Sequence, residues 1–475
     1  MTISSFSPWP SLPTESVLCA FLAALCAAKP LYNTILRSRS AVTKDTSSSS
    51  GSTGNEEFHR FQLVYLGVYL LAVLADWLQG PFVYALYRSY GYSIEDIGSL
   101  FIVGFLTSGV FGMFVGGLAD SFGRKKACLM YCILYALACV LYHSRHFYVL
   151  LLGRFLGGVS TSLLFSVFEA WMLEEHAARG FDAKSLNDTF AKATLGNGTA
   201  AIVAGVLSHF AAVKYGPIGP FQLSAFTLGV CGVMIILFWW EGTKITAAAP
   251  HRLRHHHRSS GMLRAMAEAF KVALAQPSVL LCGLVQSCFE SAMYVFVFMW
   301  TPALPESMDP GTVFTDFMIA MMIGSEVFES ITVSSSRSPP PWHPDLCPFR
   351  ADHCDCPVSC LMFFSLLRPP WQSPCLTASP MRRLLAFCVF EACCGVYFPT
   401  HYSIRSSIVP ASIRATMFNL YRIPLNVVVA KICTSVGSMD ASTVFATCSA
   451  LLAAGALLAL KNEQLLRVTT ENKKD

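Results

Sequence analysis

Long apolar runs separated by short polar breaks fill most of the chain from residue 61 onward. A helix that crosses a membrane needs about 20 mostly apolar residues. Six runs approach or meet this length before a central polar break, at 61–82, 97–119, 127–143, 147–173, 190–213 and 220–240. Five more follow the break, at 277–300, 312–333, 383–404, 414–437 and 441–460. The pattern predicts an all-α membrane protein with two helical bundles, of which the second is one helix short.

The disrupted helix would lie between residues 334 and 382. Proline is dense there, and it breaks helices because it lacks an N–H donor and clashes with the preceding turn. Only residues 358–367 form a mostly apolar run. We interpret the stretch as a divergent insertion or an incorrectly joined translation that has replaced a helix. Its cysteines do not follow the paired CxxC spacing of zinc sites, so we expect no metal site; they are Cys347, Cys354, Cys356 and Cys360.

Changes in polarity divide the chain into five predicted segments. A short apolar run at 16–28 is interpreted as a signal-peptide core, a marginal extra span or an anchor, and a serine-rich linker follows it. The segments are an N-terminal part (1–57), a six-helix bundle (58–243), a basic central loop (244–276), a second bundle (277–461) and a polar tail (462–475).

Composition and charge agree with a membrane protein. The 475 residues are 54% hydrophobic and 13% charged, and the mean hydropathy is +0.51. One soluble core cannot hide so much apolar surface. The net charge of +5 is spread over loops and tails, which indicates membrane orientation and no nucleic-acid partner. Three basic segments lie on one side of the membrane if the missing helix is counted: the turn at 124–126, the central loop and the tail. The positive-inside rule makes that side cytoplasmic.

The sequence "GGLADSFGRKKA" at 116–127 joins the second and third runs. Glycine permits close helix approach and tight turns, an aspartate caps or pairs at a helix end, and basic residues hold a loop at the cytoplasmic surface. We therefore predict a latch that exchanges partners as the helices move. Its residues are Gly116, Asp120, Gly123, Arg124 and Lys125.

This pattern, G-x-L-A-D-x-x-G-R-K, resembles the signature between helices two and three of the major facilitator superfamily. "VLLLGRFLGGVSTS" at 149–162 resembles the fourth-helix motif of that superfamily, with Arg154 as its arginine. The resemblance implies two six-helix bundles, about 12 transmembrane helices, that work by alternating access.

A narrower resemblance covers the chain from Phe58 to about Val333 and from about Leu384 to Leu460. It is carried by "FQLVYLGVYLLAVLADWLQGPFVYALY", "LLGRFLGGVSTSLLFSVFEAW", "FESAMYVFVFMWTPAL" and "FEACCGVYFP". These stretches are similar to the eukaryotic molybdate-anion transporter family, which implies molybdate uptake across the cell membrane. Residues 334–382 depart from the pattern at that family's ninth helix.

Four carboxylates inside predicted helices are candidate coupling or gating groups, because an ionisable residue near the bilayer centre costs at least about 2.5 kcal/mol. They occupy helices one, four, seven and ten, which internal symmetry relates in pairs. "VFEAW" also resembles "VFEAC", and "CFESA" shares their Phe-Glu pair. The four residues are Asp76, Glu169, Glu290 and Glu391.

Cations and amides on helices five and eleven form the candidate anion site. A tetrahedral dianion needs positive charge and converging N–H or O–H donors. The predicted set is Lys192, Asn197, Arg422 and Asn426, with Arg154 as a further cation. In the alternative interpretation these charges pair with one another, Lys192 with Glu169 or Arg422 with Glu391.

The preferred function is secondary active uptake of the molybdate oxyanion. The chain lacks a GxxxxGK[ST] loop, so direct ATP-driven pumping is disfavoured. We expect no cofactor, no enzyme activity and a monomer in the lipid bilayer, with proton coupling as a candidate mechanism. The alternatives are transport of another small solute, a sugar or other anion, and a non-transporting sensor or degenerate copy.

Overall fold

A computed structural model describes residues 52–115, 122–239, 259–337, 379–410 and 413–471 of the chain. Every regular element in these ranges is helical, which confirms the all-α prediction. The apolar run at 16–28 and most of the stretch 334–382 lie outside the described residues.

The first bundle is built from seven α-helices and a short 3-10 turn. The first predicted span continues through this turn into α3, so it is longer than the apolar run at 61–82. The elements are α2 (Ser52–Gln79), η1 (Gly80–Phe82), α3 (Val83–Ser89), α4 (Ile94–Phe111), α6 (Arg124–Leu141), α7 (Phe147–Ala178), α8 (Ala183–Tyr215) and α9 (Gly219–Phe238).

The second bundle follows the central polar break. One helix, α10, lies within the segment that the sequence assigned to a loop, so that segment is partly helical. Proline begins α11, α12 and α15, which suits a first turn whose N–H groups have no intrahelical partner. The elements are α10 (Ser259–Ala275), α11 (Pro277–Ala303), α12 (Pro310–Arg337), α15 (Pro380–Ile408), α16 (Arg414–Ser435), η2 (Val436–Ser438) and α17 (Ala441–Glu471).

Nine spans in the described part are long and apolar enough to cross a membrane. Helices α6 and α16 also occupy predicted spans, but their charged residues reduce their hydropathy. Three basic residues begin α6, and α16 carries Arg414, Arg422 and Lys431. Together these helices account for the eleven apolar runs recognised in the sequence.

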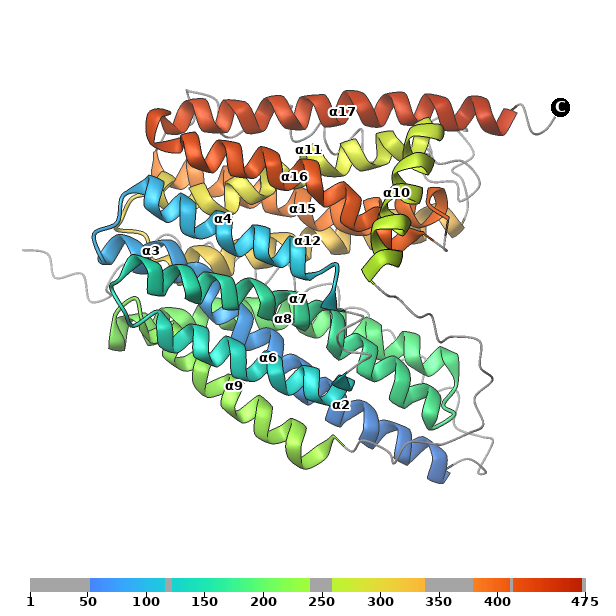
Figure 1. Ribbon diagram of the computed structural model, residues 1–475, viewed down its shortest axis with the longest axis horizontal. Helices are drawn as coiled ribbons and strands as arrows, with labels where there is room; N and C mark the ends of the chain where they lie inside the picture. Colours follow the sequence, from blue (N-terminus) through green and yellow to red (C-terminus); the bar gives the residue numbers. More distant parts are fainter. Residues whose placement is uncertain (1–51, 116–121, 240–258, 338–378, 411–412, 472–475) are drawn as a thin grey trace, which may run out of the picture.

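Figure 1 shows the two bundles side by side, converging toward the end that holds α3 and separating toward the end that holds α10. We call these the α3 end and the α10 end. Helix α4 packs against α16, and α8 packs against α12, so these two helix pairs join the bundles. Aromatic contacts add to the junction, including Phe105 against Tyr294 with ring centroids 4.7 Å apart. A chamber between the bundles would therefore be flanked by α4–α16 and α8–α12.

Candidate functional site

Near the α3 end the bundles meet at a close contact between His209 of α8 and Asp309, the residue before α12, which is an ion pair when His209 is protonated. Nδ1 of His209 lies 2.8 Å from Oδ2 of Asp309. The same carboxylate oxygen accepts a hydrogen bond from the backbone N–H of Thr312 at 2.7 Å. Gly205 and Gly311 lie where the helices meet, and a Cβ on Gly311 would be 2.7 Å from the carbonyl oxygen of Gly205. These contacts close the α3 end in this conformation.

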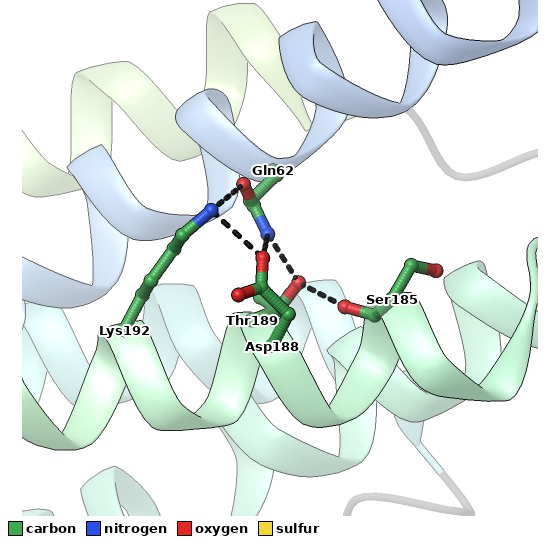
Figure 2. A network of polar contacts seen from close by, with 5 residues as sticks. All are labelled: Gln62, Ser185, Asp188, Thr189 and Lys192. Carbon is green, nitrogen blue, oxygen red and sulfur yellow. Dashed lines mark hydrogen bonds and ion pairs between the residues drawn. The ribbon is translucent and has the colours of Figure 1, made fainter. Parts of the chain in front are cut away.

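Lys192 is engaged in a polar network between α2 and α8, drawn in Figure 2. Its ammonium lies 2.7 Å from Oδ2 of Asp188 and donates to Oε1 of Gln62 at 2.9 Å. The amide of Gln62 in turn donates to Thr189 at 2.8 Å and to Asp188 at 3.3 Å. The lysine charge is therefore neutralised by its neighbour one turn away, and not by Glu169.

The groove beside Lys192 is apolar, with a volume of about 490 Å3 between α2 and α8. Leucine, valine and glycine residues form most of its walls, among them Leu70, Leu74 and Val203. Asn197 lies elsewhere on α8 and accepts a hydrogen bond from Nε1 of Trp77 at 2.9 Å. The structure therefore separates the two predicted contacts on α8: Lys192 lines this groove, while Asn197 is bonded to a tryptophan.

Arg422 and Asn426 lie on α16 and face α4 of the other bundle. A Cβ on Gly112 would lie 3.7 Å from Nη1 of Arg422, and a Cβ on Gly109 would lie 2.8 Å from Nδ2 of Asn426. Among the residues that the structure describes, the guanidinium of Arg422 has no hydrogen bond and no ion pair within 4.0 Å. It is partly exposed. Arg422 is thus a cation at the junction between the bundles that has no direct ion pair among the described residues.

Arg154 and Asp76 lie inside the first bundle, on α7 and α2. Nε of Arg154 donates to the carbonyl oxygen of Leu100 at 3.3 Å, and its charge acts on the carboxylate of Asp76. Oδ1 of Asp76 accepts a hydrogen bond from the Tyr135 hydroxyl at 2.6 Å. The surroundings of Arg154 match a structural role, since its partners all belong to one bundle.

The other predicted carboxylates occupy different environments. Glu169 is exposed on α7, Glu290 is partly exposed on α11, and Glu391 on α15 is only 5% exposed. Both Glu391 and Asp316, a residue of α12 that is 0% exposed, act electrostatically on Cys388. Glu391 therefore belongs to a buried acidic region inside the second bundle. The other acidic residue of that region, Asp316, was not predicted from the sequence.

Three of the five predicted latch residues can be placed. Gly116 and Asp120 lie outside the described residues. Gly123 has φ +95° at the start of α6, a conformation that favours glycine. Arg124 follows it, donates to the carbonyl oxygen of Ala170 at 2.7 Å, and lies 3.2 Å from Glu174. This turn is therefore tied to α7, and Lys125 lies beside it in the first turn of α6.

Two charged residues that matter for the site were missed by sequence reasoning. Asp188 precedes Lys192 by four positions, the spacing at which opposite charges pair along one helix face, so the sequence contained that signal. Arg405 of α15 contacts Gln286 of α11, and no local pattern reveals that long-range pair. Across the described ranges, no cluster of three or more metal-ligating side chains occurs; the four cysteines at 347–360 lie outside them.

Comparison with known sequences defines the class of protein. The model of a major facilitator family, described as sugar transporters with 12 transmembrane helices, matches residues 31–339. The chain belongs to this family and is a multi-pass membrane protein. Curated relatives specify the branch: the chain is 34% identical over 396 residues to the molybdate-anion transporter of Takifugu rubripes, covering 80% of each chain. It is 33% identical to the protein of the same name from Xenopus laevis, covering 82% of this chain and 81% of the relative.

Solved structures agree on the fold. The nucleoside transporter NupG matches with a TM-score of 0.62 at 11% identity, covering 85% of this chain and 99% of the other. A peptide transporter, POT, in complex with sulfate matches with a TM-score of 0.62 at 13% identity, covering 85% and 94%. These similarities confirm the predicted two-bundle transporter architecture.

Proposed function

We propose that this protein is a secondary active transporter that carries molybdate into the cell by alternating access. The names of the relatives, molybdate-anion transporter, support molybdate as the substrate, and the arrangement of the two bundles supports alternating access as the mechanism. The α3 end is closed by the contacts between α8 and α12. Opening that end while the α10 end closes would expose one central site to each side of the membrane in turn.

The assignment of an anion site depends on one observation, the lack of an ion-pair partner for Arg422 among the described residues. A cation inside a membrane helix costs several kcal/mol unless it is paired or hydrated, and this one has no ion-pair partner in the described part of the chain. An arginine offers a planar fork of N–H donors that suits an oxyanion. Asn426, one turn away, adds an amide, one N–H of which donates to the carbonyl oxygen of Arg422 at 2.8 Å. Lys192 and Asn197 would contribute only after leaving Asp188 and Trp77, and Arg154 is a more remote candidate.

Uptake of a dianion needs a driving force. Moving one negative charge into a cell whose interior is negative costs about 2.3 kcal/mol per 100 mV, so a dianion costs about twice that. Co-transport of protons would offset this cost. The candidate carriers are the helix carboxylates Asp76, Glu169, Glu290 and Glu391.

The remaining assignments follow from the same proposal. The protein works in the cell membrane, because its proposed task is uptake from outside. It acts as a monomer, since each chain contains both bundles of the transport unit, and it carries out transport without enzymatic chemistry or a cofactor. The latch residues from Gly116 to Lys125 would stabilise one conformation at the cytoplasmic side.

Uptake of labelled molybdate in cells that express the full chain tests the function. We expect saturable uptake that unlabelled tungstate and sulfate reduce to different extents. Arg422→Gln should abolish most of this uptake, whereas Lys431→Gln, an exposed cation on the same helix, should not. Uptake no greater than in cells without the protein would refute the proposal.

The main rival is a transporter of neutral sugars, which the description of the matching family favours. In that case Arg422 and Lys192 would serve the structure, and Arg422→Gln would leave oxyanion selectivity unchanged. Competition of labelled molybdate with a panel of sugars separates the two functions. A degenerate, non-transporting copy predicts no uptake of either solute.

A further inference from the structure

A second arginine lies close to the candidate anion site, in the last turns of α15. Nη1 of Arg405 donates to Oε1 of Gln286 on α11 at 3.3 Å. Its guanidinium lies 3.4 Å from the ring centroid of Phe418 on α16. Arg405 therefore bridges three helices of the second bundle. The aromatic contact fixes the position of its guanidinium.

Glu290 connects this arginine with Arg422. Both guanidinium charges act on the Glu290 carboxylate, and Gln286, the partner of Arg405, lies one turn before Glu290 on α11. Neither arginine forms an ion pair within 4.0 Å of that carboxylate in the ranges that the structure covers. All three charged side chains are partly exposed. Two cations thus face one carboxylate without direct neutralisation, which leaves a surplus of positive charge.

We propose that Arg405 is a second anion-binding residue, which forms with Arg422 a two-arginine cradle for a tetrahedral dianion. The inference rests on the proposed function for its substrate class. Glu290 is the counter-charge of the cradle when no anion is bound, and it competes electrostatically with the anion. Two guanidinium forks match the charge and the several acceptor oxygens of such a dianion.

The position of the cradle also fits alternating access. Arg405 and Glu290 belong to α15 and α11 of the second bundle, while Arg422 faces Gly112, the residue that follows α4 of the first. An anion bound here would lie at the junction that changes when the bundles move. Because Phe418 and Gln286 already position Arg405, little side-chain entropy is lost on binding.

Anion binding to the purified full-length protein tests the cradle. Sodium molybdate and sodium sulfate are titrated by calorimetry, with thermal unfolding as a second readout. Arg405→Gln should weaken anion binding about tenfold or more, the loss expected for one charge-assisted hydrogen bond. Arg405→Lys keeps the charge but loses the fork, so its affinity should be intermediate. The matched control is Arg382→Gln, an exposed arginine near the other end of the same helix, which should bind like the unaltered protein.

Glu290→Gln should change the anion affinity in the opposite direction to Arg405→Gln. Removing the competing carboxylate should strengthen anion binding several-fold, whereas a residue with a merely structural role would weaken binding when replaced. Equal affinities for Arg405→Gln and Arg382→Gln, or weaker binding by Glu290→Gln, would overturn the cradle.

The two proposals fail separately. Molybdate uptake that is unaffected by Arg405→Gln would overturn the cradle and leave the function intact. Sulfate binding that depends on Arg405, in a protein that takes up no molybdate, would support the cradle and refute the function. If neither anion binds to the unaltered protein, the cradle is wrong.

Discussion

The close packing of α8 against α12 makes Gly205 a sensitive position for testing alternating access. A Cβ at this position would lie 2.9 Å from the carbonyl oxygen of Gly311 and 3.0 Å from the backbone nitrogen of Thr315. Both atoms belong to the backbone of α12, so neither can move aside as a flexible side chain would. Gly205→Ala therefore forces the two helices apart at the α3 end.

The size of the effect follows from the cost of overpacking. An extra carbon in a tightly packed interface costs about 1–3 kcal/mol. Because the contact joins two bundles, we expect this cost to fall on the conformation closed at the α3 end. The ratio of closed to open molecules should then fall by about 5- to 150-fold. A transporter shifted this far from closure should have a lower maximal rate of uptake.

A crosslinking assay measures the closed population directly. Cysteines replace His209 and Asp309, whose side-chain atoms lie 2.8 Å apart, and a short bifunctional thiol reagent traps the closed end. Single-cysteine variants account for reaction at native thiols. Crosslinking should decrease in the Gly205→Ala background, while the thermal unfolding of the protein changes little.

Gly229→Ala on α9 is the matched control, because a Cβ there meets no other atom within 4 Å. Both substitutions raise helix propensity equally, so a difference between them reports the contact with α12. The reasoning is wrong if the two variants give the same crosslinking yield and the same maximal rate of uptake.

Two further substitutions test single polar contacts. Asp188→Asn should release the neighbouring lysine and lower the KM for molybdate by up to about fivefold, the change in affinity expected when a partly exposed ion pair no longer has to be broken. The control is Asp182→Asn, which should leave KM unchanged because asparagine caps a helix equally well. An unchanged KM for Asp188→Asn would show that the lysine does not contact the anion. Tyr135→Phe removes the hydrogen bond to Asp76 and should destabilise the protein by about 1.5–3 kcal/mol, seen as a lower melting temperature. The control Tyr148→Phe alters a residue that is 72% exposed; equal melting temperatures for the two variants would refute the assigned contact.

The candidate site was only partly predictable because charge pairing depends on how each helix is rotated. The pair of Lys192 with Asp188 is local, and its four-residue spacing was readable in the sequence. The pairing of Arg405 with Gln286 spans 119 positions. Hydropathy locates α15 and α11 but does not specify which of their faces meet. The position of Arg422 against α4 likewise depends on contact between the bundles.

The sequence alone determined that the chain is an all-α membrane protein with two bundles, and roughly where each helix lies. This was possible because a membrane core requires apolar runs of about 20 residues with internally satisfied backbone groups, and such runs can be recognised without knowing their neighbours. The pair of Lys192 with Asp188 lies within one helix, so its spacing was present in the sequence. Only the tertiary structure decided which charges on different helices approach one another: Arg422 faces the other bundle without an ion-pair partner among the described residues. The physical reason is that charge compensation acts over a few ångströms between side chains of different helices, and only the packing of those helices sets such distances.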